Sequence, residues 1–180
     1  EGFLVDKTGE LEKQEKVLRA EIKETQKTFL KLWNSHWYKN GRKIKWKKND
    51  IVPCDQDIRD MLFRRIGFPV DEETKDGKPA TGKKVLQTLA RQFPKWKEFL
   101  MLLLELKKAD KLLGTYIVRM RDKMIWRDAH TVAGIKYPEG WYFRPGYNVP
   151  GARTMRLSSR PNIQNIPKKT IRRAFISRWK

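Results

Sequence analysis

The chain has 180 residues, a length that suits one average domain or two small ones. Its seven Trp, eight Phe and five Tyr argue against wholesale disorder. A single cysteine, Cys54, excludes an internal disulfide, and one Cys with two His excludes a standard four-ligand zinc site. The longest apolar run, Phe99 to Leu104, has six residues, far fewer than the ~20 that cross a membrane.

The formal net charge is +20, from 41 Lys and Arg against 21 Asp and Glu, and such an excess attracts polyanions. Nucleic acid is the favoured partner, because each neutralised phosphate releases counterions. An anionic membrane surface is a second reading, but it calls for a terminal basic helix with a strongly apolar face. A merely basic protein without a polyanionic partner is the third.

The two ends of the sequence are abrupt. The chain opens on Glu1 rather than Met, and its first residues lack the basic start and apolar length of a signal peptide. It closes on the basic residues Ser177 to Lys180. We therefore expect the sequence to be a piece of a longer protein.

The first predicted element is a long helix from about Thr8 to Trp33, with its end at Asn34. Residues suited to one buried face recur at steps of three and four or their sums, namely Leu11, Leu18, Ile22, Thr25, Phe29 and Leu32. Residues 39–48 then hold six bases and no acid. Asn40-Gly41 is a turn signal, so a short hairpin is expected between the flanks Trp37-Tyr38 and Ile44-Trp46.

Asp55 is the predicted N-cap of a second helix that reaches about Ile66, with Asp57 near its positive end. Gly67-Phe68-Pro69 stops this helix. A polar loop follows over Asp71–Ala80, with a turn predicted at Asp76-Gly77.

Thr81 is the predicted cap of a third helix, whose apolar positions are Val85, Leu86, Leu89 and Ala90. Pro94 separates it from a long helix over about Lys95 to Arg121. The apolar side of that helix is predicted to hold Trp96, Phe99, Leu100, Leu103, Leu106, Leu113 and Ile117.

After Asp122 the pattern changes to short β-like runs broken by Gly and Pro. These runs are Met124-Ile125-Trp126, Thr131-Val132-Ala133, Gly140-Trp141-Tyr142-Phe143 and Tyr147-Asn148-Val149. The predicted class is therefore α+β, with a helical region over 1–122 and the first antiparallel β elements over 123–180.

The last thirty residues, 151–180, hold nine Arg and Lys and no Asp or Glu. They also carry short polar groups able to reach phosphates or base edges. A solvated basic tail is the plain alternative. Apolar residues spaced through the segment, among them Ile166 and Ile171, favour a packed one.

The segment Thr154–Pro167 reads T-M-R-L-S-S-R-P-N-I-Q-N-I-P, followed by I-R-R-A-F-I over 171–176. It closely resembles the motif of family A DNA polymerases, the bacterial and phage DNA polymerase I type, which reads T-G-R-L-S-S, a spacer, P-N-L-Q-N-I-P and a basic R-x-A-F stretch. Met155 stands where the family usually has Gly. Met would strain a backbone that needed positive φ there, and the plainer reading is that the site tolerates a side chain.

Upstream segments resemble the same family. Lys111–Tyr116 is similar to K-L-x-x-T-Y at the end of the long thumb helix, and Leu62–Pro69 to L-F-x-x-L-G-L-P. Thr74–Thr81 is similar to the loop at the tip of the thumb, and Gly2–Asp6 to the start of the polymerase domain. The resemblance therefore implies a thumb over 1–122 and the N-terminal part of a palm over 123–180.

The resemblance also implies roles in gripping primer–template DNA. Arg156 matches the arginine that reaches the minor-groove edge of the primer-terminal base pair. The polar residues implied to track the nearby duplex are Thr154, Ser158, Ser159, Asn162, Gln164 and Asn165. The residues implied to hold phosphates are Lys75, Lys78, Lys83, Lys111 and Thr115.

The family's chemistry uses two Mg²⁺ ions clamped by carboxylates. The chain reaches Lys180 without the first of these carboxylates, and it also lacks the second and the fingers helix that holds the incoming dNTP. Capping is a better reading of Asp55, Asp57 and Asp60 than a metal site. We expect this chain to be inactive alone and to need the missing fingers and palm in cis or in trans.

Two functions fit these features. The first is part of a DNA-dependent DNA polymerase that adds deoxynucleotides to a primer 3′ end. The second is a non-catalytic DNA-binding subunit or half of a split polymerase. The expected setting is the cytoplasm of a bacterium or phage-infected cell, with an organelle left open, and no membrane partner is expected.

Overall fold

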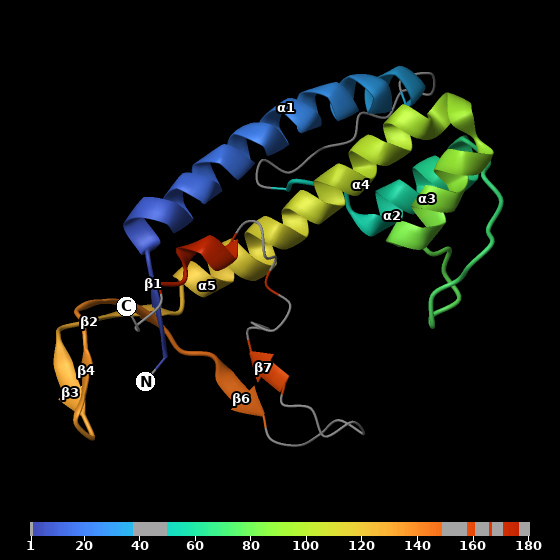
Figure 1. The fold of residues 1–180 in the computed structure, drawn as a ribbon. Coiled ribbons are helices and arrows are strands. Elements are labelled where there is room, and N and C mark those ends of the chain that lie inside the picture. Colours follow the sequence, from blue (N-terminus) through green and yellow to red (C-terminus); the bar gives the residue numbers. More distant parts are fainter. Residues whose placement is uncertain (1, 38–49, 149–157, 161–165, 167–170, 177–180) are drawn as a thin grey trace. The chain divides into compact units, whose positions relative to one another are not determined.

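The structure is a computed structural model that describes residues 2–37, 50–148, 158–160, 166 and 171–176 (Figure 1). The chain divides into two compact units. Unit 1 comprises Glu1–Arg19 and Lys111–Lys180, and unit 2 comprises Ala20–Asp110. The division into thumb and palm at residue 122 stays a prediction.

The first helical stretch begins as a π-helical turn, η1 (Lys7–Leu11), and continues as α1 (Glu12–Trp37). Asp6 caps it, because its carboxylate accepts from the amides of Gly9 at 2.8 Å and Glu10 at 3.0 Å. Of the predicted inward face, Leu11, Ile22 and Phe29 are buried, whereas Leu18, Thr25 and Leu32 are half-buried. Trp33, which was not predicted to face inward, is buried as well.

The predicted end at Asn34 is wrong, since α1 runs three residues further. An Asn inside a helix costs less than about 1 kcal/mol relative to Ala. Burial of Phe29 and Trp33 in the preceding turns outweighs that cost. The predicted hairpin around residues 38–46 falls outside the described residues.

Unit 2 is built from short helices packed around aromatic residues. After α1 come α2 (Asp55–Arg59), the π-helical η3 (Asp60–Arg65), α3 (Lys83–Gln92), the 3₁₀ turn η4 (Pro94–Trp96) and α4 (Lys97–Lys111). Phe29 stacks on Phe99 with ring centroids 5.1 Å apart, and Trp33 lies 6.0 Å from Phe99. The same core includes Ile58, Met61, Leu62, Val85, Leu86, Leu89, Ala90, Leu100, Leu103 and Leu106.

Both predicted caps in unit 2 are shifted by one residue. Cys54, not Asp55, is the N-cap of α2, and its thiol accepts from the Asp57 amide at 3.4 Å. Gly82, not Thr81, is the N-cap of α3. The Thr81 side chain is buried and bonds to other elements instead, so the tertiary contacts decide the cap. The predicted end of the second helix before Gly67 is confirmed, since η3 ends at Arg65 and Gly67 has a φ of 82°.

In unit 1 the long helix continues past α4 as the π-helical η5 (Leu112–Val118) and then α5 (Arg119–Arg121). Leu113, Ile117 and Met120 are buried. The nearly buried Glu15 carboxylate accepts from Arg121 at 2.8 Å and from Arg19 at 2.7 Å. This ion pair ties the first helix to the end of the long one.

The sheets of unit 1 are small and antiparallel. The three-stranded sheet has the order β1 (Phe3–Val5), β5 (Gly140–Phe143), β2 (Met124–Arg127), with Val5, Trp141 and Trp126 in one row. Two hairpins pair β3 (His130–Val132) with β4 (Ile135–Tyr137) and β6 (Gly146–Asn148) with β7 (Ser158–Arg160). The α+β class is therefore confirmed.

The runs predicted near residues 124, 131, 140 and 147 all contain strands. The strands β1, β4 and β7 were not predicted, because each has three residues, a run too short for alternation to identify a strand.

The two ends of the chain meet in unit 1. Asp6 donates its amide to the Ala174 carbonyl at 2.8 Å, and the Ile176 amide donates to Leu4 at 3.0 Å. These bonds flank a β-bridge between Val5 and Phe175, next to the 3₁₀ turn η6 (Ile171–Ala174). Ile166, Ile171 and Ala174 are buried, so these parts of the C-terminal segment pack, as expected, rather than forming a solvated tail.

Among the described residues, no helix is both long enough and apolar enough to cross a membrane.

Candidate nucleic-acid interface

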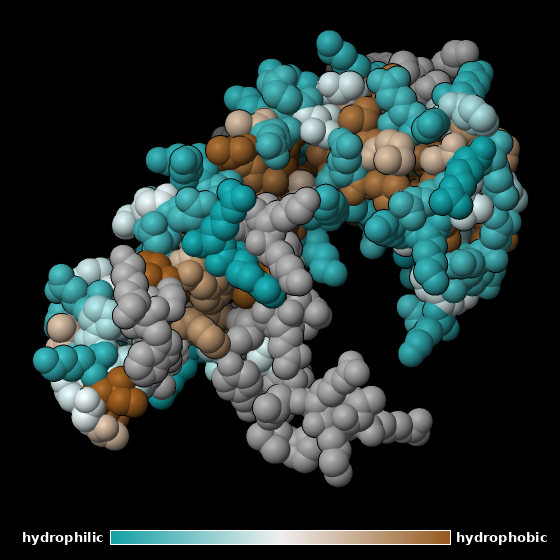
Figure 2. All heavy atoms as spheres, in the orientation of Figure 1, coloured by the Kyte–Doolittle hydropathy of each residue, from teal (hydrophilic) through white to brown (hydrophobic). Residues whose placement is uncertain are grey.

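The polar loop of unit 2 folds as a narrow hairpin that extends from the helices (Figure 1). Thr74 donates its amide to Lys78 at 2.7 Å, and the Ala80 amide donates to Glu72 at 2.9 Å. The turn at the tip is confirmed by Gly77, whose φ of 65° favours glycine and whose amide reaches Thr74 at 3.0 Å. The surface of this loop is mostly hydrophilic (Figure 2).

Charge is distributed unevenly along this loop. Its start is acidic, with Asp71, Glu72 and Glu73, whereas the tip carries Lys75 and Lys78 around Asp76. Both lysines are exposed. Within this loop, the side chains able to attract a phosphate therefore lie at the tip.

Lys83 is exposed at the first position of α3. The amide groups of a helix N-terminus are partly positive, so the Lys83 ammonium adds to a positive end. Lys75, Lys78 and Lys83 thus lie in one short stretch of unit 2, at the loop tip and at the helix start that follows it.

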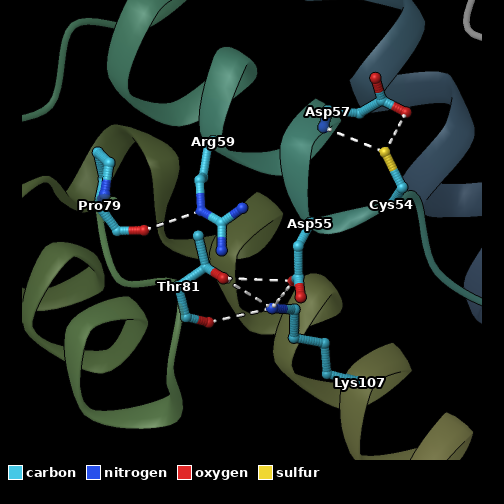
Figure 3. Close-up of polar contacts among 7 residues, drawn as sticks. All are labelled: Cys54, Asp55, Asp57, Arg59, Pro79, Thr81 and Lys107. Carbon is cyan, nitrogen blue, oxygen red and sulfur yellow. Dashed lines mark hydrogen bonds and ion pairs between the residues drawn. The ribbon is translucent and has the colours of Figure 1, made fainter. Parts of the chain in front are cut away.

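A polar cluster joins the C-terminal arm of the loop to the helices of unit 2 (Figure 3). The Lys107 ammonium, from α4, donates to the Thr81 carbonyl, the Thr81 hydroxyl and Asp55 Oδ1, each at 3.1 Å. Arg59, from α2, donates through Nε to the Pro79 carbonyl at 3.0 Å. Two helices therefore hold residues 79–81 from two directions.

The charge state of Asp55 fits this cluster. Burial alone favours the neutral acid, but the hydrogen bond and charge of Lys107, with smaller contributions from Arg59 and Thr81, lower the pKa of Asp55 below its ordinary value. Asp55 is therefore a carboxylate at neutral pH and a charged partner for Lys107.

Beside this cluster lies a groove of about 510 Å³ lined by residues 50–55, Lys107 and Asp110. Burial and the nearby charge of Asp50 raise the pKa of Asp110. Three carboxyl groups against one lysine make the groove unattractive to phosphate.

The phosphate ligands expected in unit 1 lie on one helical stretch. Lys111, the last residue of α4, is exposed, and Thr115, in η5, is half-buried. A spacing of four residues places them on the same face of a helix.

The C-terminal motif is described only in part. Ser158 and Ser159 lie in β7, where Ser159 is buried and pairs with Tyr147 of β6. Residues 158–160 of the motif thus form one strand of an antiparallel pair. Thr154, Met155, Arg156, Asn162, Gln164 and Asn165 lie outside the described residues.

Among the described residues there is no group of three or more His, Cys, Asp or Glu side chains placed to hold a metal ion. The three acids of α2 and the first position of η3 have other partners. Asp55 pairs with Lys107, Asp57 accepts from the Cys54 thiol at 3.1 Å, and Asp60 pairs with Arg64 at 3.3 Å.

Sequence reasoning missed Arg59 and Lys107 and gave Thr81 the wrong partner. A signal for Lys107 was present, because it follows Leu103 by four residues and so falls on the apolar stripe of α4. A lysine at such a position needs an acceptor. Nothing in the sequence identified that acceptor as the loop arm.

Comparison with known proteins places this fold. Residues 8–180 match the family described as DNA polymerase family A, and the chain belongs to this family. DNA polymerase I of Pseudomonas aeruginosa is 31% identical over 126 residues, which cover 65% of this chain and 12% of that protein. The thermostable DNA polymerase I of Thermus aquaticus is 32% identical over 124 residues, 65% of this chain and 13% of that protein.

A solved structure shares the fold. It is the POL domain of Pol1 from M. smegmatis, in complex with DNA primer-template and dNTP, with a TM-score of 0.69 and 24% identity over 97% of this chain and 26% of that one. The chain spans only 12% to 13% of the length of the curated relatives named above.

Proposed function

We propose that this chain is the thumb and N-terminal palm of a DNA-dependent DNA polymerase, which extends a primer 3′ end under the direction of a template. The observation that carries the proposal is the match to the DNA polymerase family over residues 8–180. The net charge of +20 supports a polyanionic partner.

In this proposal the two groups of residues have different tasks. Lys75, Lys78 and Lys83 of unit 2, with Lys111 and Thr115 of unit 1, hold phosphates and supply affinity independent of sequence. The C-terminal motif tracks the duplex at the primer end, through Arg156 together with Thr154, Ser158, Asn162, Gln164 and Asn165. Minor-groove acceptors occupy similar places in every base pair, so these side chains sense pair shape without reading sequence. The buried Ser159 supports the motif through the pairing of β7 with β6.

The complete enzyme would bind an incoming dNTP and use Mg²⁺ held by carboxylates elsewhere. When bound, Mg²⁺ would stabilise the charge that develops on the transferred phosphoryl group. The chain of 180 residues would then bind duplex but not extend it. The same interface would serve a split enzyme, with the remainder on a second polypeptide.

The test is Arg156→Ala in the complete enzyme that contains this sequence. Loss of one preorganised donor at the primer terminus is expected to lower kcat/KM. The loss should correspond to an increase of about 2–4 kcal/mol in the activation free energy. Arg153→Ala removes the same charge from a position outside the family motif and is the matched control. A loss below ~0.5 kcal/mol for Arg156→Ala would contradict the assigned role.

A second measurement tests the division of labour. Primer extension by the 180-residue chain alone, with Mg²⁺ and all four dNTPs, should give no product. Reproducible extension would overturn the claim that the chain is silent alone.

A further inference from the structure

We propose that Lys107 and Arg59 are positioning residues, which hold the loop over residues 71–82 in order before DNA binds, so that Lys75 and Lys78 meet DNA phosphates without a further loss of loop freedom. This inference rests on the proposed function and deepens it. Neither positioning residue is proposed to contact DNA.

The hydrogen bonds of Lys107 show why it acts through the loop. An ammonium has three N–H donors, and the three acceptors of Lys107 are the Thr81 carbonyl, the Thr81 hydroxyl and Asp55 Oδ1, each at 3.1 Å. Only 27% of its side chain is exposed. Its donors are therefore occupied, and it is a poor phosphate ligand.

A continuous series of bonds leads from these helices to the loop tip. Arg59 and Lys107 hold Pro79 and Thr81, and the residue between them, Ala80, packs against the core. The Ala80 amide then holds Glu72 of the opposite arm. Nearer the tip, the Thr74 amide donates to the Lys78 carbonyl at 2.7 Å and closes the loop (Figure 3 shows the attached arm).

The position of Lys75 and Lys78 makes such an anchor useful. They lie within four residues of each other on the two sides of the Gly77 turn, so one rigid hairpin presents both ammonium groups together. A loop ordered during folding does not lose that conformational freedom again on binding, which raises affinity without adding a contact.

The experiment measures the affinity of the 180-residue chain for primer–template DNA as a function of salt. Lys107→Met removes the anchor, and Lys108→Met removes the same charge from the adjacent exposed position of α4 as a matched control. The double variant Lys75→Ala/Lys78→Ala removes the proposed phosphate ligands. Each lost phosphate contact should reduce the slope of log K against log salt by about 0.9.

We expect Lys107→Met to weaken binding of primer–template DNA about fivefold or more. The slope of log K against log salt should fall by roughly 0.9 to 1.8, which corresponds to one to two lost phosphate contacts. In the Lys75→Ala/Lys78→Ala background Lys107→Met should have no further effect beyond that of Lys108→Met, because the loop then has no phosphate ligand to position. Amide exchange at Thr74, Gly77, Lys78 and Ala80 should speed up in Lys107→Met and stay unchanged in Lys108→Met.

Two milder variants keep the test informative if Lys107→Met unfolds the chain. Thr81→Val removes one acceptor of Lys107 but leaves the carbonyl, and Arg59→Met removes the bond to Pro79. Each should give part of the loss, and Lys107→Arg should restore part of the affinity.

The outcomes separate the two proposals. If Lys75→Ala/Lys78→Ala weakens binding but Lys107→Met matches Lys108→Met, or if the losses are additive, the positioning role is refuted and the proposed function stands. If Lys75→Ala/Lys78→Ala changes nothing, the loop does not bind DNA and the inference is refuted with it. An unmodified chain that does not bind primed duplex overturns both.

Discussion

The two units of this molecule are assembled in different ways. Unit 2 comes from one continuous segment, Ala20–Asp110, and its core is entirely apolar side chains of helices and their connections. Unit 1 joins the first nineteen residues to residues 111–180 through strand pairing and an ion pair. The named contacts of unit 2, such as Phe29 with Phe99, thus join residues of one continuous segment, whereas unit 1 depends on contacts between residues more than one hundred positions apart.

The surfaces of the units differ as well. In unit 1, β2 is at the edge of the three-stranded sheet, and Ile125 and Trp126 on it are 56% and 49% exposed. Val132 and Ile135, opposite each other in the β3–β4 hairpin, are also exposed. An edge strand with apolar side chains is prone to pair with other chains. We therefore expect unit 1 to be the more aggregation-prone of the two.

The largest expected effect is on the core of unit 2. Phe29→Ala removes a buried ring stacked 5.1 Å from Phe99 and should lower the free energy of unfolding by about 3–5 kcal/mol. Amide exchange should accelerate throughout residues 50–110 and far less in β1 and β5. Met101→Ala, at an exposed position of α4, should stay within about 0.5 kcal/mol. Equal acceleration in both units would show that they do not respond separately.

An intermediate effect is expected at the ion pair of unit 1. Glu15→Ala leaves Arg121 without its 2.8 Å partner, and about a third of the Arg121 side chain is exposed, so we expect a loss of about 2 kcal/mol. The faster exchange should appear in residues 111–121. The control is Glu24→Ala on the same helix, whose partner Lys27 is exposed, and it should not change stability measurably. A Glu15→Ala variant as stable as Glu24→Ala would contradict the structural role of the pair.

The smallest effect is a pH dependence of the loop anchor in unit 2. The folded-state pKa of Asp55 is lowered by Lys107, Arg59 and Thr81 against the opposing effect of burial, so its ionisation stabilises the folded state above pH 3.8. That contribution is lost as the pH falls through the lowered pKa. Because the carboxylate is largely exposed, it should amount to at most about 0.5 kcal/mol.

The check compares unfolding of the unmodified chain and of Asp55→Asn between pH 7 and pH 2. The difference should be present at pH 7 and vanish toward pH 2. A difference that is constant across this range would show that the Asp55 charge is not the cause.

The candidate interface was only partly predictable. The Gly77 turn and the exposed lysines beside it follow from local sequence, because a turn with positive φ and a polar loop are short-range properties. The hydrogen bonds from Lys107 to Thr81 were not predictable, since the two residues are 26 positions apart and Thr81 has the residue type of a helix cap. The DNA roles of Arg156 and its neighbours stay predictions.

The sequence alone determined the class and most helices of this protein. Apolar residues at helical spacing, such as Leu100, Leu103 and Leu106, specify which face is buried whatever they pack against. Tertiary structure alone decided that β1 pairs with β5 and with Phe175, and that Gly82 rather than Thr81 caps α3. The reason is physical: these choices depend on hydrogen-bond partners that the fold brings from distant parts of the chain, and no local pattern encodes such a partner.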